Sequence, residues 1–322
     1  MSYLKTAKEF YREAAKTPEE GLCCTSAPSW VLPGLKIPDS MLEMNYGCGT
    51  TVHPRDLARS PAVLYVGVGG GMELLQFAYF RRRPGAVVGI EPVDEMRASA
   101  ARNFAEAARL NDWFSEEFIL LKAGDALKLP VETESVDLVA QNCLFNIFEE
   151  PDLMQALAET YRVLAPHGRF VTSDPIAPGP LPDHLTHDER LRAMCLSGAI
   201  TYTRYLDLLV EAGFGTIEVR ARRPYRVLDP VRFGLEAPVL LESIEVAALK
   251  DPIPDDGACV FTGRTAIYFG TEQIYDDGQG HLLQRDQPLS VCDKTAAQLQ
   301  ALGRHDLLVT PSTWFYDGGG CC

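Results

Sequence analysis

The 322-residue sequence has no apolar run that approaches the roughly 18 residues of a membrane-spanning helix, so we expect no contact with a membrane. Positive charge is also scarce: 30 Lys and Arg residues stand against 44 Asp and Glu residues, for a formal net charge of −14. Such a chain repels nucleic acid at long range, which argues against a nucleic-acid partner. Its first residues have the pattern of an amphipathic helix and not of a signal peptide, which predicts a cytoplasmic protein.

Two common cysteine and glycine patterns are also missing. The sequence has no C-x-x-C pair, which argues against a structural zinc site. The G-x-G-x-x-G fingerprint of dinucleotide dehydrogenases is absent from the glycine-rich stretch at residues 67–71. The nine cysteines are an odd number in a chain without an export signal, so we expect reduced, functional thiols and not a disulfide framework.

What the sequence does contain is an alternation of apolar strands and amphipathic helices, which is typical of an α/β fold with a mostly parallel sheet. We expect strands at residues 63–66, 87–91, 118–122, 136–140 and 169–172, and helices at 3–16, 94–110, 151–164, 187–194 and 202–212. Three regions follow from this pattern. They are an N-terminal helix and cysteine-bearing cover (1–60), a ligand-binding α/β domain (61–223), and a C-terminal region (224–322) with a helix at 235–250 and a mobile Gly-Gly-Gly-Cys-Cys arm.

The glycines that follow the first strand predict a pocket for a nucleotide-type cofactor. Gly67, Gly69 and Gly71 form a turn in which a ligand can approach bare backbone. Glu91 ends the second strand about 20 residues later, where a carboxylate accepts hydrogen bonds from ribose hydroxyls. After the third strand, Asp125 and Ala126 are placed to contact an adenine amino group. This order is similar to that of seven-stranded S-adenosylmethionine-dependent methyltransferases.

Three dispersed cysteines stand at the edges of this pattern. Cys143 follows the fourth strand at its carboxyl end, where open α/β sheets bind their ligands. Cys195 stands at the end of a predicted helix, and Cys48 lies between two glycines that offer it little packing. A free cysteine is often only a small buried hydrophobe. Three thiols beside a cofactor pocket nevertheless indicate a soft, thiophilic substrate.

The segments Tyr46-Gly47-Cys48-Gly49, Asn142-Cys143-Leu144-Phe145-Asn146 and Cys195-Leu196-Ser197-Gly198-Ala199, together with the glycine turn, resemble the arsenite S-adenosylmethionine methyltransferases across residues 42–214. The resemblance implies a seven-stranded, mostly parallel Rossmann-like methyltransferase sheet with an N-terminal cover and a C-terminal α+β appendage. It also implies three ligands for trivalent arsenic, namely Cys48, Cys143 and Cys195. The residues that it places in contact with S-adenosylmethionine are Tyr46, Gly67, Glu91 and Asn142.

In this family a further cysteine forms a disulfide during turnover, and Cys23 or Cys24 would match it. An external thiol reductant, thioredoxin or glutathione, would then reset the enzyme. The tail with Cys321 and Cys322 is similar to that of a branch associated with arsenosugar synthesis, and these two thiols would capture substrate. One departure concerns Tyr65, which stands where the family has an acid, so the glycine turn must be braced from elsewhere.

The resemblance predicts methylation of thiol-bound arsenite and then methylarsenite, in a chain that we expect to be monomeric. The number of methyl groups finally added stays open. One alternative is a methyltransferase for a small organic molecule, with structural cysteines and with His184 or His187 as its base. The other alternative is a non-catalytic metalloid carrier, motivated by Tyr65 and by the terminal cysteine pair.

Overall fold

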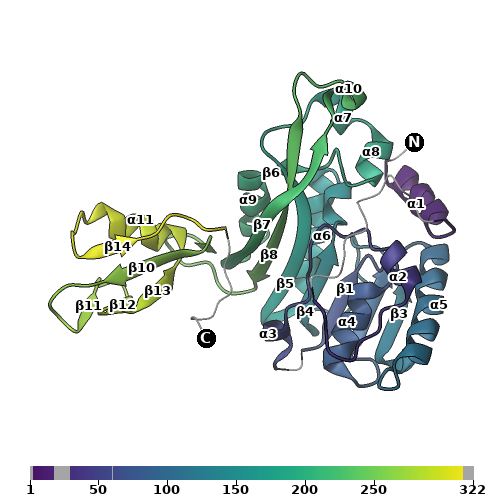
Figure 1. The fold of residues 1–322 in the computed structure, drawn as a ribbon, viewed down its shortest axis with the longest axis horizontal. Helices are drawn as coiled ribbons and strands as arrows, with labels where there is room; N and C mark the ends of the chain where they lie inside the picture. Colours follow the sequence, from purple (N-terminus) through teal and green to yellow (C-terminus); the bar gives the residue numbers. More distant parts are fainter. Residues whose placement is uncertain (1–2, 18–29, 60, 315–322) are drawn as a thin grey trace.

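The computed structural model describes residues 3–17, 30–59 and 61–314 of the chain (Figure 1). Four cysteines with predicted roles lie outside the described residues: Cys23, Cys24, Cys321 and Cys322. None of the helices in the described ranges combines the length and the apolar character that a membrane span needs.

A nine-stranded sheet forms the centre of the described structure, in the order β3-β2-β1-β4-β5-β8-β7-β9, with β6 paired to β5. The strands are β1 (Val63–Val66), β2 (Val87–Glu91), β3 (Ile119–Ala123), β4 (Val136–Asn142), β5 (Leu164–Ala177), β6 (Ile200–Thr201), β7 (Thr216–Leu228), β8 (Val239–Leu249) and β9 (Cys259–Phe261). Strands β1 to β5 are parallel to one another. Strand β8 is antiparallel to both of its neighbours, β5 and β7. The predicted seven-stranded sheet is therefore present, and the two-residue β6 and the three-residue edge strand β9 are added to it.

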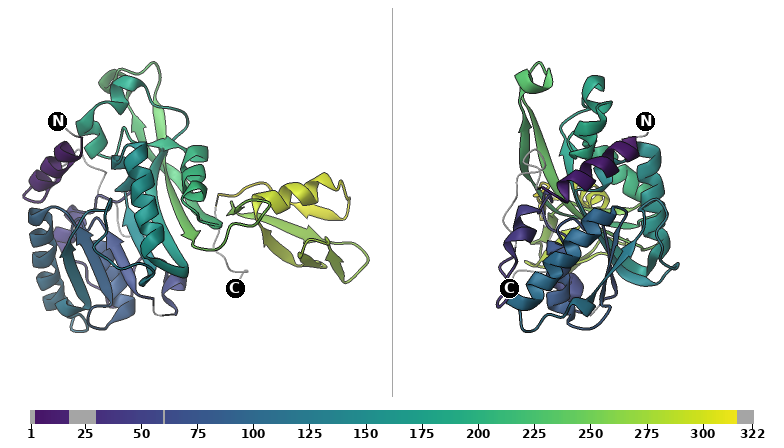
Figure 2. Two further views of the ribbon diagram at one scale, coloured as in Figure 1. Left: turned by 180° about the vertical axis from the view of Figure 1, so that it is seen from behind. Right: turned by 90° about the vertical axis from the view of Figure 1, so that its right-hand side faces the viewer.

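Helices cover both faces of this sheet, which gives three layers (Figures 1 and 2). The alternation of strand side chains explains why: Val63 and Tyr65 of β1 point into one apolar cluster, and Leu64 and Val66 point into another. The first cluster is completed by α2 (Asp39–Glu43), α3 (Pro54–Leu57), α4 (Met72–Arg81) and α5 (Asp94–Leu110). The second is completed by α6 (Glu150–Val163) and α9 (Tyr202–Glu211).

Short elements surround the carboxyl ends of the strands. They are α1 (Tyr3–Ala14), η2 (Phe145–Ile147), α7 (Asp183–Thr186), α8 (Glu189–Ala193) and α10 (Pro230–Phe233). A further short helix, η1 (Glu116–Phe118), directly precedes β3 at the amino end of that strand. Helix α1 packs against α5 and α8, and Figures 1 and 2 show it beside both. Its first turn is fixed by hydrogen bonds from Tyr3 to Asp152 and from Thr6 to Glu189.

The predicted helix at 235–250 is wrong, because most of this segment is strand β8. Its side chains from Leu241 to Ala248 are mostly buried, since β8 lies between β5 and β7. A strand covered on both faces is apolar throughout, and its sequence has the composition of a buried helix. The predicted boundary at residue 223 falls inside β7, and the central sheet continues through β8 to β9, which ends at Phe261.

The last part of the described chain forms a small unit of its own, here named the C-terminal module (residues 262–314). Its strands are β10 (Arg264–Tyr268), β11 (Ile274–Asp276), β12 (Leu282–Gln284), β13 (Pro288–Val291) and β14 (Leu307–Val309), and its helix is α11 (Asp293–Ala301). A separate apolar core that includes Ala266, Leu283 and Leu299 holds these elements together. The module projects from the end of the molecule opposite to α1 (Figures 1 and 2).

Candidate active site

The pocket of interest opens at the carboxyl ends of β1 and β4, two neighbouring strands from which the chain continues in opposite directions across the sheet. This is the place where open parallel sheets bind ligands. The pocket encloses about 850 Å³, a volume that includes its open mouth. Six of the predicted cofactor residues line it, namely Gly67, Gly69, Glu91, Asp125, Ala126 and Asn142, and so does Cys143.

The glycine turn presents bare backbone to this pocket and is braced from strand β2. Gly67 and Gly69 have φ values of 81° and 52°, a conformation that favours glycine. The two carboxylate oxygens of Glu91 accept hydrogen bonds from the N–H groups of Val68 (3.1 Å) and Val93 (3.0 Å). Burial raises the pKa of Glu91 to about 7. Each carboxylate oxygen keeps a further acceptor position, so Glu91 can brace the turn and still bind a hydroxyl group.

The acid that is missing at Tyr65 is supplied by the next helix. The Tyr65 hydroxyl donates a hydrogen bond to Glu73 on α4 (2.7 Å), and burial beside that carboxylate raises the tyrosine pKa well above its usual value. Glu73 also accepts hydrogen bonds from the Thr50 hydroxyl (3.1 Å) and from the Thr51 N–H and hydroxyl (2.8 Å each). Tyr65 and Glu73 therefore fasten the segment that follows Cys48 to the centre of the sheet.

Two predicted cofactor residues, Gly71 and Tyr46, are not among the described residues that line the pocket. Gly71 precedes α4 with φ of 88°, and a Cβ atom there would lie 2.7 Å from the Phe104 ring. Close packing thus requires glycine at this position. Tyr46 packs, partly buried, against an apolar cluster that includes Val93 and Met96, which both line the pocket.

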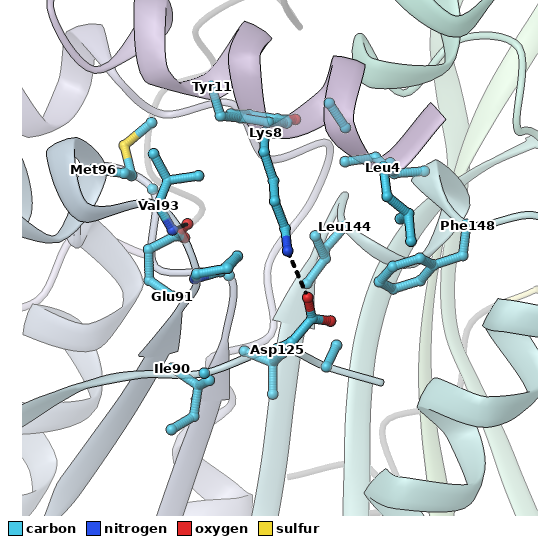
Figure 3. Close-up of a pocket in the computed structure, with 18 of the residues that line it drawn as sticks. Leu4, Lys8, Tyr11, Ile90, Glu91, Val93, Met96, Asp125, Leu144 and Phe148 are labelled. Carbon is cyan, nitrogen blue, oxygen red and sulfur yellow. Dashed lines mark hydrogen bonds and ion pairs between the residues drawn. The ribbon is translucent and has the colours of Figure 1, made fainter. Parts of the chain in front are cut away.

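Helix α1 closes the pocket, which the sequence did not reveal. Leu4, Ala7, Lys8 and Tyr11 all belong to the pocket wall. Figure 3 shows α1 above the pocket, with Lys8 pointing down to Asp125, and the two charged atoms are 3.0 Å apart. The amphipathic pattern of residues 3–14 was a detectable signal for a helix, but it contained no information about which surface the helix covers.

The Cys48 loop, defined as residues 47–51, crosses the ends of three adjacent strands. Asn142 on β4, Ser173 on β5 and Glu245 on β8 are register partners in a row across the sheet. Asn142 accepts a hydrogen bond from the Cys48 N–H (3.1 Å) and donates one to the carbonyl oxygen of residue 49 (2.9 Å). The Cys48 sulfur lies 3.4 Å from the Ser173 hydroxyl, and Glu245 accepts a hydrogen bond from the Thr50 N–H (3.1 Å).

The glycines on either side of Cys48 are explained by this crossing. A Cβ atom on Gly47 would lie 2.6 Å from the Asn142 amide nitrogen, and one on Gly49 would lie 2.4 Å from the Ser173 hydroxyl oxygen. Only glycine lets the backbone approach the strand ends this closely. The Gly-Cys-Gly pattern therefore holds the Cys48 thiol against the sheet.

The Glu245 carboxylate is buried beneath this loop. Burial raises its pKa, and the guanidinium group of Arg223, 2.9 Å away, opposes that rise. Its neighbour His53 has its pKa lowered to about 4 by burial and by the positive charge of Arg220, and is therefore neutral at physiological pH. Ser173 and Glu245 were not predicted as site residues, because nothing local in the sequence links β5 or β8 to Cys48.

Cys143 and Cys195 are both buried and both have φ of 58°, in the left-handed region that non-glycine residues rarely adopt. The Cys195 thiol donates a hydrogen bond to the Cys143 carbonyl oxygen (2.6 Å), and the Cys143 N–H donates one to the Ser173 carbonyl oxygen (2.7 Å). Cys195 also contacts the Tyr11 hydroxyl of α1 (3.8 Å). Both cysteines belong to one apolar cluster, and Cys48 packs against that cluster. Within the described residues, however, no three His, Cys, Asp or Glu side chains are close enough together to hold a metal ion, so the structure places the three cysteines in one region without joining their sulfur atoms into one ligand set.

The two histidines considered as alternative bases lie elsewhere. The ring of His184 is hydrogen-bonded to the Phe233 carbonyl oxygen (2.9 Å), and that of His187 to the Asp183 carbonyl oxygen (2.7 Å). Neither is among the described residues of the pocket wall. The geometry thus brings Cys143, and not an imidazole base, to the wall of this pocket.

Comparison with known proteins identifies the part of the chain that builds this pocket. Residues 64–172, from β1 into β5, match the family model described as "Methyltransferase domain". This part of the chain is similar to a methyltransferase domain. The crystal structure of an arsenic (III) S-adenosylmethionine methyltransferase from Chlamydomonas reinhardtii has the same fold as the methyltransferase domain and its flanking regions. It matches with a TM-score of 0.64 at 24% identity, over 90% of this chain and 99% of the other.

Sequence relatives extend the similarity beyond the methyltransferase domain. An arsenite methyltransferase from Halobacterium salinarum is 33% identical over 177 residues, which is 55% of this chain and 43% of the relative, so the match spans less than half of that protein. An arsenite methyltransferase from Aquipseudomonas alcaligenes is 27% identical over 288 residues, 86% of this chain and 81% of the relative. The predicted resemblance to arsenite methyltransferases is thereby confirmed.

Proposed function

We propose that the chain transfers a methyl group from S-adenosylmethionine to trivalent arsenic held by Cys48, Cys143 and Cys195. One observation carries the proposal. Cys143 lines the pocket, and it also belongs to the apolar cluster that contains Cys195 and against which Cys48 packs. The names of the two sequence relatives support arsenic as the substrate.

The residues of the pocket fit S-adenosylmethionine. Gly69 has no atom nearer than 4.0 Å to the position of a Cβ, so its backbone is open to a ligand. The carboxylates of Glu91 and Asp125 provide acceptors for the ribose diol and the adenine amino group, and Ile90 and Phe148 provide apolar walls. When bound, the cofactor supplies a methyl group attached to a positively charged sulfonium.

The thiols would hold arsenic in a pyramidal arrangement that leaves its lone pair free. Aligning this lone pair with the methyl carbon makes the reaction effectively unimolecular, which can contribute up to roughly 7 to 11 kcal/mol. The arsenic–carbon bond forms as the sulfur–methyl bond breaks, the bonding pair stays on that sulfur, and no general base is needed. Arsenic is thereby oxidised by two electrons.

Two thiols of the chain would return these electrons by forming a disulfide and releasing two protons. Cys48, on a loop and half-buried, is suited to this exchange with Cys23 or Cys24, which lie outside the described residues. An external thiol, thioredoxin or glutathione, would reduce the disulfide again. The monomeric state stays a prediction.

The decisive experiment is arsenite-dependent formation of S-adenosylhomocysteine by the full chain. Turnover with arsenite and none without it supports the proposal, whereas turnover with an organic nucleophile alone favours the organic-substrate alternative. Calorimetry with S-adenosylmethionine distinguishes both from a carrier, because a chain that binds arsenite but no cofactor cannot be the enzyme.

Single cysteine variants separate the roles of the three thiols. Methylarsenite has one As–C bond and accepts only two thiolates, so Cys48→Ser should lose methylation of arsenite and retain much of its activity on methylarsenite. Cys143→Ser and Cys195→Ser should lose both, since serine supplies no soft thiolate at neutral pH. Product chromatography after each reaction measures these activities. A Cys48→Ser chain that methylates arsenite at the wild-type rate would contradict the three-thiolate model.

A further inference from the structure

A second pair of thiols lies where the central sheet meets the C-terminal module. Cys259 begins β9, the edge strand that pairs with β7 through Thr216. Cys292 directly precedes α11 of the module, and α11 packs against β9. Neither cysteine belongs to the methyltransferase pocket or to the cluster around Cys143.

Hydrogen bonds on both sides of the pair hold the two cysteines next to each other. Before Cys259, the carbonyl oxygen of residue 257 accepts a hydrogen bond from the Lys294 ammonium group (2.7 Å). After β9, the Thr262 hydroxyl donates one to the Asp293 carboxylate (2.6 Å). The first turn of α11 is therefore tied to the chain at both ends of β9, which brings Cys292 close to Cys259.

Burial and the nearby Cys292 thiol raise the pKa of Cys259. Cys292 is buried and its sulfur lies 3.2 Å from the Thr295 hydroxyl, whereas Cys259 is only half-buried. Cys259 is thus the more accessible cysteine of the pair. Two adjacent sulfur atoms can bind a single soft atom between them.

The number of ligands restricts what that atom can be. Within the described residues, no group of three or more His, Cys, Asp or Glu side chains is arranged to hold a metal ion. Structural zinc requires four ligands and arsenite has three exchangeable positions, so neither is matched by two thiols. A trivalent arsenical with one carbon substituent has two exchangeable positions, which equals the number of sulfur atoms present.

We propose that Cys259 and Cys292 form a dithiol site for trivalent arsenicals with a single carbon substituent. Binding exchanges the two As–OH bonds of the ligand for two As–S bonds, and each thiol proton leaves with a hydroxide as water. Arsenic stays trivalent, so no oxidant or reductant is needed. The identity of the biological ligand as the singly methylated product rests on the proposed function, but the binding chemistry does not.

The site is tested with phenylarsine oxide, a trivalent arsenical that carries one phenyl group. In the full chain, native mass spectrometry should show one bound probe fewer per chain in Cys259→Ser and in Cys292→Ser than in the wild type. A variant with the other seven cysteines replaced by serine should bind one probe. Its affinity should fall about 100-fold when either remaining thiol is also removed, because the second bond forms at high effective concentration.

Equal stoichiometry in the wild type and in both single variants would overturn the proposal, and this comparison holds even if the seven-serine chain does not fold. A mass two hydrogens lower, with no probe bound at this pair under reducing conditions, would also overturn it and indicate a structural disulfide. Failure of the proposed function is recognised separately: wild-type chain that forms no S-adenosylhomocysteine with arsenite can still lose one bound probe in Cys259→Ser.

Discussion

Replacing Gly49 by alanine tests whether close packing of the Cys48 loop positions its thiol. Gly49 does not have a positive φ, so the substitution changes space and not backbone strain. The added Cβ would lie 2.4 Å from the Ser173 hydroxyl oxygen and 2.7 Å from a Glu245 carboxylate oxygen. Neither atom can withdraw freely, because Ser173 contacts the Cys48 sulfur and Glu245 binds the N–H of Thr50.

Overpacking of this kind costs about 1 to 3 kcal/mol. We expect the free energy of unfolding of Gly49→Ala, measured with urea, to fall by that amount. Because the loop must move away from β5 and β8, the kcat/KM for arsenite should fall as well, while the dissociation constant of S-adenosylmethionine should stay near the wild-type value.

Gly179→Ala is the matched control, since no atom lies within 4 Å of its Cβ position, and its stability should change by less than about 0.5 kcal/mol. Combining Gly49→Ala with Ser173→Ala removes the nearer of the two clashing atoms and should recover part of the lost stability. A Gly49→Ala chain as stable and as active as Gly179→Ala would refute the explanation of the Gly-Cys-Gly pattern.

Three further variants test separate features. Burial raises the pKa of Glu91 from 4.5 to about 7, so the folded chain retains a proton that the unfolded chain has lost. The free energy of unfolding of the wild type, measured with urea relative to that of Glu91→Gln, should therefore fall by up to about 3 kcal/mol as the pH rises from 4.5 to 7. A difference between the two chains that does not change with pH would contradict this. Tyr11→Ala should weaken S-adenosylmethionine binding by about 1 to 2 kcal/mol in calorimetry, and Lys5→Ala, exposed on the same helix, should not. Because Cys143 has φ of 58°, thermal unfolding should show Cys143→Gly about 1 kcal/mol more stable than Cys143→Ala, and equal stability would show that the left-handed backbone costs nothing.

Local patterns were sufficient to predict much of the fold. The strands at 63–66 and 87–91 and the helix at 94–110 have the predicted bounds, because each is a short apolar run or a periodic helix that ends at clear signals. Strand β8 was mistaken for a helix because its apolar run is explained only by its two neighbours in the sheet, β5 and β7. Local sequence patterns contain no information about which segments far apart in the chain pair with each other.

The candidate site divides in the same way. Gly67, Glu91 and Asp125 could be proposed as site residues because they occur at or just after strand ends in a fixed order, whereas Asn142 was proposed from the resemblance alone. Their partners could not, since the contact of Cys48 with Ser173 joins residues 125 positions apart. The left-handed backbone of Cys143 and Cys195 also had no signal, because such a conformation is expected at glycine and not at cysteine.

The hydrogen bond between Thr50 and Glu245 spans 195 positions, which has a consequence for the chain during its synthesis. The Cys48 loop is made early, but β8, on which it rests, emerges from the ribosome almost 200 residues later. At the usual rates of translation this interval lasts roughly 10 to 40 s. Until β8 is made the loop lacks this last docking strand, so the Cys48 thiol is more open to oxidants and to free arsenite in the nascent chain than in the finished one.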